Sequence, residues 1–237
     1  MKEIVVIIGC SFFAGITILL GGLIGNFIET HSNKKIETYI LHWTGAFGGG
    51  ILIAAVAFVL TPKGINIFSV QCFTLVFLSG AVVFFVLERF IEKKGGFLSQ
   101  VMVMLMDFIP EAIALGAVFV LDHHLGVLLA FFIGFQNLPE SYNAYFELRK
   151  NNQTGKNILT SFLMLSFLGV IASLAGRCFL LNKPDFTAGI MLFSSGGILY
   201  LIFQDIAPQS KIKNHWEPAL GACLGFLVGM IGTKLFG

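Results

Sequence analysis

Glu111 and Glu140 each follow a proline directly, and they lie in two neighbouring apolar segments of the sequence. Asp107 lies four residues before Glu111, and Gln136 lies four residues before Glu140. On helices, each pair would therefore share one face. An ionised carboxylate near the middle of a bilayer costs at least about 2.5 kcal/mol, and far more when it is isolated. Three such groups close together require a cation, protons or polar partners, and the pattern favours a cation site.

The composition shows which environment must hold these carboxylates. Of the 237 residues, 56% are hydrophobic and only 12% are charged, and the mean hydropathy is +0.87. These values are far from those of an average soluble protein and indicate a polytopic membrane protein whose main surroundings are the lipid bilayer. The net charge of +2 is small and the basic residues form short separate clusters, which argues against nucleic acid as a partner.

Apolar runs between charged residues, Asn, Gly and Pro predict an all-α integral membrane protein. A bilayer core of about 30 Å requires roughly 20 residues at about 1.5 Å per residue. The short connections leave no room for a soluble domain, so residues 1–237 are predicted to form a single transmembrane domain. Its eight predicted helices are approximately 4–26, 43–61, 68–91, 98–121, 125–148, 158–181, 186–207 and 216–236.

The distribution of lysine and arginine predicts the orientation. With the N-terminus outside, ten of the fifteen basic residues fall in inner loops and five fall on the outer side. The positive-inside rule therefore favours both termini outside. The expected location is the plasma membrane, which for a bacterial protein is the inner membrane, with the chain crossing it several times.

Polar residues form one stripe on each of the two segments that carry the Pro-Glu pairs. On 98–121 the stripe runs from the inner end to mid-membrane, and beyond it the same face becomes apolar, with Leu115 and Val118. The matching stripe on 125–148 runs from mid-membrane back to the inner end. Both stripes therefore open inward and predict a central site joined to an inner vestibule, with an apolar outer half. The residues are Gln100, Met104, Asp107 and Glu111 on the first segment, and Gln136, Glu140, Asn143 and Glu147 on the second.

Pro110 and Pro139 are predicted to contribute as well. Each lacks an N–H and clashes with the carbonyl four residues earlier, which frees the carbonyls of Met106 and Phe135. In membranes such irregular backbone is tolerated mainly where it lines a cavity or meets an ion. A simple bend is the alternative for either proline alone.

A plainer alternative also exists for the carboxylates, namely that they are protonated and hydrogen-bond neighbouring helices. Neither segment carries a lysine or arginine near these positions, so a salt bridge between the two segments is not available. Asp205, near the inner end of 186–207, has two interpretations: it helps to receive a departing ion, or it caps or hydrates a helix end.

These motifs resemble the ZIP (Zrt/Irt-like) family of metal transporters, in particular its bacterial GufA-type branch. Residues 136–141 read Gln-Asn-Leu-Pro-Glu-Ser, close to that branch's Gln-Asn-x-Pro-Glu-Gly. Residues 107–112 read Asp-Phe-Ile-Pro-Glu-Ala, where the family has His-Asn-x-Pro-Glu-Gly. Residues 193–208 and 47–55 are similar to the family's helix seven and glycine-rich helix two. The resemblance covers essentially the whole chain and implies an eight-helix ZIP-like bundle with both termini outside.

The resemblance also implies a ligand set. Asp107, Glu111, Gln136 and Glu140 would hold the metal in the primary site. A second site found in some relatives uses the asparagine position occupied here by Phe108 and a glutamate that falls near Ala172, so the second site is expected to be absent. Replacement of histidine by Asp107 leaves only oxygen ligands, which favours Mn²⁺ or Fe²⁺ over the zinc of typical relatives, although zinc also accepts carboxylates.

The expected function is therefore transport of divalent metal ions into the cytoplasm, with the ion as substrate (Zn, Mn or Fe) and without enzymatic activity. Three alternatives stay open: a ZIP-like metal sensor or scaffold that binds without transport, an intramembrane enzyme using the carboxylates as acid and base, and a proton-coupled transporter of an organic solute. Besides metal ions and lipid, a homodimer is a possible assembly.

Overall fold

The computed structural model describes residues 2–94, 96–181, 183–212 and 215–236, and within these ranges the chain is almost entirely helical and contains no strand. The elements are α1 (Lys2–His31), α2 (Lys34–Ala55), η1 (Val56–Leu60), α3 (Thr61–Ile67), α4 (Val70–Lys94), α5 (Gly96–Leu121), α6 (His123–Lys150), α7 (Gly155–Leu180), α8 (Pro184–Leu201), η2 (Ile202–Ile206), α9 (Ala207–Gln209) and α10 (Glu217–Phe236). The segments η1 and η2 are single turns of π-helix.

Seven helical stretches in the described residues are long and apolar enough to cross a membrane. The remaining long helix, α6, has 28 residues and thus spans about 42 Å at 1.5 Å per residue, but it is more polar. The chain is therefore an all-helical, multi-pass membrane protein. Each predicted span overlaps one observed stretch, but the predicted bounds 4–26 and 43–61 were too short, because α1 ends at His31 and α2 begins at Lys34.

Helices α2 and α6 begin before their predicted spans because polar residues cap their N-termini. The Asn33 side chain accepts a hydrogen bond from the Ile36 amide at 3.0 Å, which starts α2 well before the first strongly apolar residues. Asp122 caps α6 in the same way, accepting from the Leu125 amide at 3.1 Å. Hydropathy indicates which residues lie in the hydrocarbon core of the membrane, and it gives no information about helix caps.

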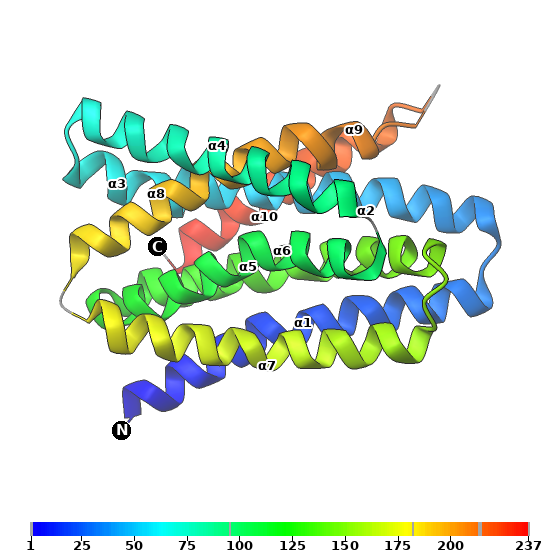
Figure 1. The fold of residues 1–237 in the computed structure, drawn as a ribbon, viewed down its shortest axis with the longest axis horizontal. Coiled ribbons are helices and arrows are strands. Elements are labelled where there is room, and N and C mark those ends of the chain that lie inside the picture. The colour runs from blue at the N-terminus through cyan, green and yellow to red at the C-terminus, as the bar shows by residue number, and fades with distance from the viewer. Residues whose placement is uncertain (1, 95, 182, 213–214, 237) are drawn as a thin grey trace.

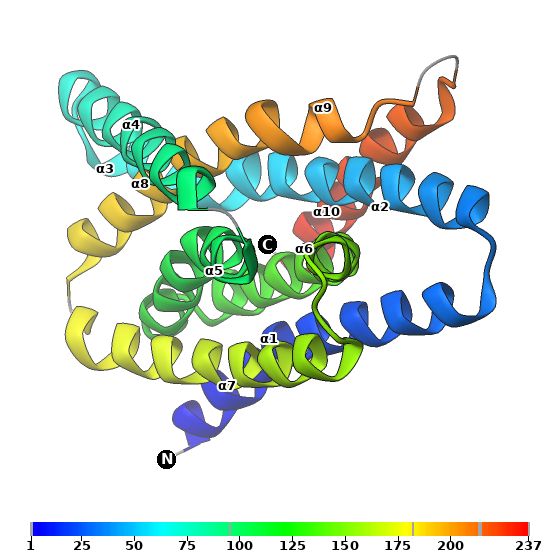
Figure 2. The same ribbon diagram turned by 45° about the vertical axis from the view of Figure 1, so that its right-hand side comes forward.

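Successive helices run back and forth, and the N and C labels both lie in the left half of Figure 1. We call the end formed by the turns after α1, α4, α6 and α9 the basic end, because most lysines and arginines lie near it in the sequence. Helices α5 and α6 lie in the middle, between α1 and α7 on one side and the group containing α2, α4 and α8 on the other (Figure 2).

Small residues bring the helix backbones together. A Cβ on Gly225 of α10 would lie 2.0 Å from the Phe47 carbonyl oxygen of α2, and a Cβ on Gly229 would lie 2.3 Å from the Ala54 Cβ. Because lipid supplies no hydrophobic drive between helices, such close contact is a main source of their association.

The release of the Met106 and Phe135 carbonyls by Pro110 and Pro139 stays a prediction, and neither proline interrupts its helix. Helices α5 and α6 remain α-helical across Pro110 and Pro139. The irregular backbone instead lies at η1 and η2, each of which ends just before a proline that opens a short helix, Pro62 in α3 and Pro208 in α9. A π-turn widens the helix by one residue, which accommodates the missing proline N–H.

Candidate functional site

A cavity of about 270 Å³ lies between α2, α4, α5, α6 and the α8–η2–α9 stretch. It extends from Asp107 and Gln136, near the middle of α5 and α6, to Gln209 and Ser210 at the basic end. Its charged lining residues are all acidic, and no lysine or arginine of the described chain lines it. They are Glu88, Asp107, Glu140, Glu147 and Asp205.

Of the four predicted metal ligands, Asp107, Gln136 and Glu140 line the cavity. Glu111 is not part of the lining; it lies behind Gln136 and is only 1% exposed. The Gln136 amide Nε2 donates a hydrogen bond of 2.5 Å to Glu111 Oε2, which joins α5 to α6. The structure thus brings the predicted residues together at the closed end of the cavity.

Two oxygen atoms of this pair have no partner in the described part of the chain. Glu111 Oε1 and Gln136 Oε1 are buried and accept no hydrogen bond. A buried acceptor without a partner is destabilising by about 1–3 kcal/mol, more for a charged group. Both atoms can therefore accept a further hydrogen bond or bind a cation, and Glu111 Oε1 can also bind a proton.

The carboxylates interact electrostatically but do not converge on a single point. The charge of Glu140 interacts with those of Asp107 and Glu111, while Asp107 also accepts a hydrogen bond of 2.8 Å from the Phe108 amide. Within the described residues, no three His, Cys, Asp or Glu side chains are grouped closely enough to hold a metal ion. Coordination by all four predicted ligands thus requires side-chain movement.

The predicted polar stripe of α6 faces the cavity. Its four members, Gln136, Glu140, Asn143 and Glu147, all line the cavity. On α5 only Asp107 does: Met104 is buried elsewhere in the core, and the side chain of Gln100 lies outside the described residues.

The other half of α5 is closed, as predicted. Leu115 is 1% exposed and Val118 is fully buried, and both belong to the hydrophobic core. The polar cavity consequently opens toward only one end of the bundle, the basic end.

Phe108, at the position where the similar ZIP motif has an asparagine, is packed into the core. Its ring packs on Gly169 of α7, where an added Cβ would lie only 2.4 Å from the Phe108 Cζ. Phe108 is 3% exposed and Ala172, one turn further along α7, carries no ligand atom. The expectation that a second metal site is absent stays a prediction.

A comparison with protein-family models finds no match for this sequence, and a comparison with curated proteins finds none either. The resemblance to the ZIP family stays a prediction that rests on the motifs. The functional argument is therefore based on the geometry of the cavity.

Sequence reasoning missed one carboxylate of this cavity, Glu88 of α4. It is 2% exposed and lines the same space as Asp107. Its position inside the predicted span 68–91 was the available signal, because an acidic residue within a membrane segment is rare and usually functional. Arg89 follows directly and made the region resemble the charged end of a span.

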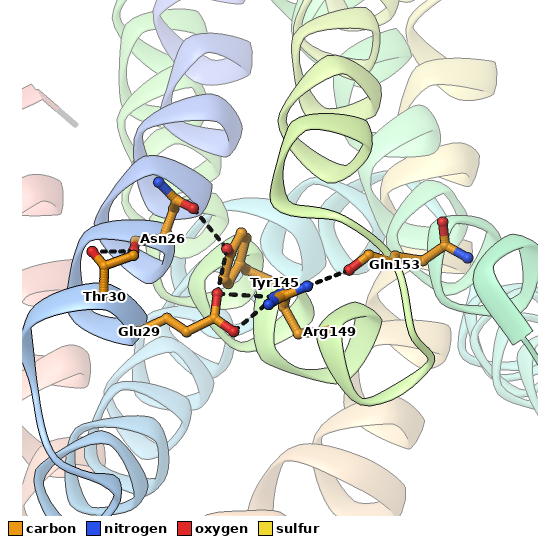
Figure 3. A network of polar contacts seen from close by, with 6 residues as sticks. All are labelled: Asn26, Glu29, Thr30, Tyr145, Arg149 and Gln153. Carbon is orange, nitrogen blue, oxygen red and sulfur yellow. Dashed lines mark hydrogen bonds and ion pairs between the residues drawn. The ribbon is translucent and has the colours of Figure 1, made fainter.

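The half of α6 nearer the basic end is held to α1 by a polar cluster (Figure 3). The Arg149 Nε donates to both carboxylate oxygens of Glu29, at 2.7 and 2.9 Å. The Tyr145 hydroxyl contacts Glu29 Oε2 at 2.7 Å and Asn26 Oδ1 at 2.9 Å. Arg149 also donates to the Gln153 carbonyl at 2.6 Å, which fixes the turn after α6. The cluster fixes the helix that supplies most of the polar lining of the cavity.

Proposed function

We propose that this protein is a transporter of divalent transition-metal ions, zinc or a related ion such as manganese or iron. The ion would pass through the site formed by Asp107, Glu111, Gln136 and Glu140 between α5 and α6. The observation that carries the proposal is a cavity inside a multi-pass membrane protein whose charged lining is entirely acidic among the described residues. Its lining residue Gln136 and the buried Glu111 behind it each carry an oxygen atom without a partner in the described chain.

The chemistry of these groups favours a cation over other substrates. Carboxylates bind metal ions only when deprotonated, so an arriving ion would displace protons from Glu111 and Glu140. An anionic solute would meet repulsion from every charged group in the lining. An all-oxygen set favours Mn²⁺ or Fe²⁺, and zinc also accepts oxygen ligands.

The one-sided cavity supports a direction of movement. We infer that the basic end faces the cytoplasm, with both termini outside, because lysine and arginine gather in the loops at that end. The arrangement then corresponds to a state open to the cytoplasm, in the plasma membrane of a bacterial cell. Transport would require a second state in which the apolar half around Leu115 and Val118 opens and the basic end closes.

The test is uptake of Zn²⁺, Mn²⁺, Fe²⁺ and Cd²⁺ into proteoliposomes that contain the purified full chain. We expect saturable uptake of at least one ion, and a loss of at least tenfold in Glu111→Gln and Glu140→Gln, which keep the side-chain shape and remove the charge. Asp185→Asn, on an exposed turn at the start of α8, is the matched control and should transport normally.

The same experiment separates the rival functions. Metal binding without flux in folded protein would replace transport by the sensor or scaffold interpretation. Absence of both binding and flux would overturn the metal hypothesis. Flux of an organic solute that is indifferent to metal would favour the solute-transporter alternative.

A further inference from the structure

Glu88 of α4 is a buried carboxyl group that the proposed α5–α6 site does not use. Its side chain is 2% exposed, and neither carboxylate oxygen has a hydrogen-bond partner among the residues that the structure describes. It nevertheless lines the cavity, together with Ile91 one turn later on the same helix. The carboxylate therefore faces the space through which an ion from Asp107 would have to pass.

Glu88 comes from a different wall of the cavity than the α5–α6 ligands. Its helix packs mainly against α8, where a Cβ on Gly80 of α4 would lie 1.9 Å from the Phe193 carbonyl oxygen. One turn before Glu88, the Phe84 ring packs on Gly197 of α8. These contacts fix the rotation of α4 about its axis and so fix the face on which Glu88 lies.

The position along the helices places Glu88 between the α5–α6 site and the basic end. Glu88 lies six residues before the end of α4 at that side, and Asp107 lies eleven residues after the start of α5. At about 1.5 Å per residue these are depths of about 9 Å and about 16 Å. Glu88 is consequently about 7 Å nearer to the basic end.

A role in packing alone does not explain the group. A buried polar group that only contributes to packing is normally hydrogen-bonded, and an isolated buried charge is strongly unfavourable. No lysine or arginine among the described lining residues can neutralise it. Only a proton or a mobile cation remains as a partner within the cavity.

We propose that Glu88 is a second cation-binding station of this transporter, which takes a hydrated divalent ion after it leaves the α5–α6 site. This inference rests on the proposed function and adds a second position to it. A hydrated divalent ion needs only one or two carboxylates because water supplies its other ligands. At roughly 30 Å³ per water, a cavity of about 270 Å³ has room for such an ion.

The test counts bound Mn²⁺ by electron paramagnetic resonance in the purified full chain. We expect two Mn²⁺ per native chain. Glu88→Gln should weaken the binding of one Mn²⁺ at least tenfold and leave the binding of the other unchanged. The double variant Glu111→Gln/Glu140→Gln should lose the Mn²⁺ that Glu88→Gln retains. Asp185→Asn, an exposed carboxylate in the first turn of α8, is the control for general surface charge and should bind two.

Glu88→Asp tests whether charge matters rather than shape. It should keep the second ion, whereas Glu88→Gln should not; equal behaviour of the two variants would contradict the proposal. Unchanged Mn²⁺ stoichiometry and affinity in Glu88→Gln would overturn the station and leave the proposed function standing. Loss of an ion in Glu88→Gln with none lost in the double variant would instead overturn the α5–α6 site.

Discussion

We predict that the residue at position 107 decides which ions the proposed site between α5 and α6 prefers. Asp107 offers carboxylate oxygen where the similar ZIP motif has an imidazole, and its side chain lines the cavity. Nitrogen ligands raise the preference for zinc over manganese, since manganese binds N-donors weakly. Asp107→His should therefore raise the ratio of Zn²⁺ to Mn²⁺ uptake by about tenfold, equivalent to about 1.4 kcal/mol.

Competition between the two ions in proteoliposomes measures this ratio directly. Asp107→Asn, which removes the charge without supplying a nitrogen ligand of comparable strength, is the matched variant and should lower uptake of both ions. A ratio that does not differ between the native chain and Asp107→His would show that position 107 does not coordinate the ion.

At the same scale, the sequence predicted some site residues and missed others for a physical reason. The Pro-Glu spacing found Asp107, Gln136 and Glu140, because residues four apart share a helix face regardless of the neighbours. It did not predict that Glu111 would lie behind Gln136, nor that Glu88 would face the cavity. Both depend on how a helix is rotated against its neighbours, and this rotation is set by contacts between helices far apart in the sequence.

Among the elements, α5 and α7 depend on a contact that tolerates no side chain. A Cβ on Gly116 would lie 1.7 Å from the Ser173 carbonyl oxygen, and the Ser173 hydroxyl donates a hydrogen bond of 2.9 Å to the Ala112 carbonyl one turn earlier. Gly116→Ala should push the two helices apart and destabilise the protein by about 1–3 kcal/mol. The measurement is the apparent midpoint of thermal unfolding in one detergent.

Gly9 of α1 supplies the matched control for this substitution. A Cβ at that position would meet nothing within 4 Å, so Gly9→Ala should keep the midpoint or raise it slightly through better helix propensity. Equal midpoints for Gly116→Ala and the native chain would mean that α5 and α7 are not in close contact in the membrane.

Element boundaries illustrate the other limit of prediction. Hydropathy located the long helical stretches of the described chain, yet it did not predict the π-turns η1 and η2 that interrupt two of them. A π-turn is decided by local competition between backbone hydrogen bonds, here next to Pro62 and Pro208. The turn η2 carries Asp205 into the cavity lining, so this small irregularity changes the site itself.

On the scale of the whole molecule, the fold is asymmetric about the middle of the bundle. Polar cavity residues occupy the half nearer the basic end, while large buried side chains such as Phe119, Phe132 and Ile133 fill the opposite half. The α5–α6 site lies at the boundary between the two. A single rearrangement that separates α5 and α6 from their neighbours on the apolar side would expose the same ligands to the other side of the membrane.

Cysteine accessibility tests both this asymmetry and the orientation. In a background with Cys10, Cys72, Cys178 and Cys223 replaced by serine, Asn143→Cys lies in the cavity lining and should react with a membrane-impermeant thiol reagent from the cytoplasmic side alone. Leu115→Cys lies in the buried half and should react from neither side.

Lys63→Cys, at the opposite end of the bundle in α3, should react from the outside only and fixes the orientation. If Lys63→Cys reacted from the cytoplasm and Asn143→Cys from outside, the chain would be inverted and the cavity would receive ions rather than release them. Reaction of Leu115→Cys from the outside, suppressed when Mn²⁺ is added, would mean that the outward-open state is already populated without the ion. In that case metal binding would select the inward-open arrangement, because a ligand shifts an equilibrium only toward the state that it binds more tightly.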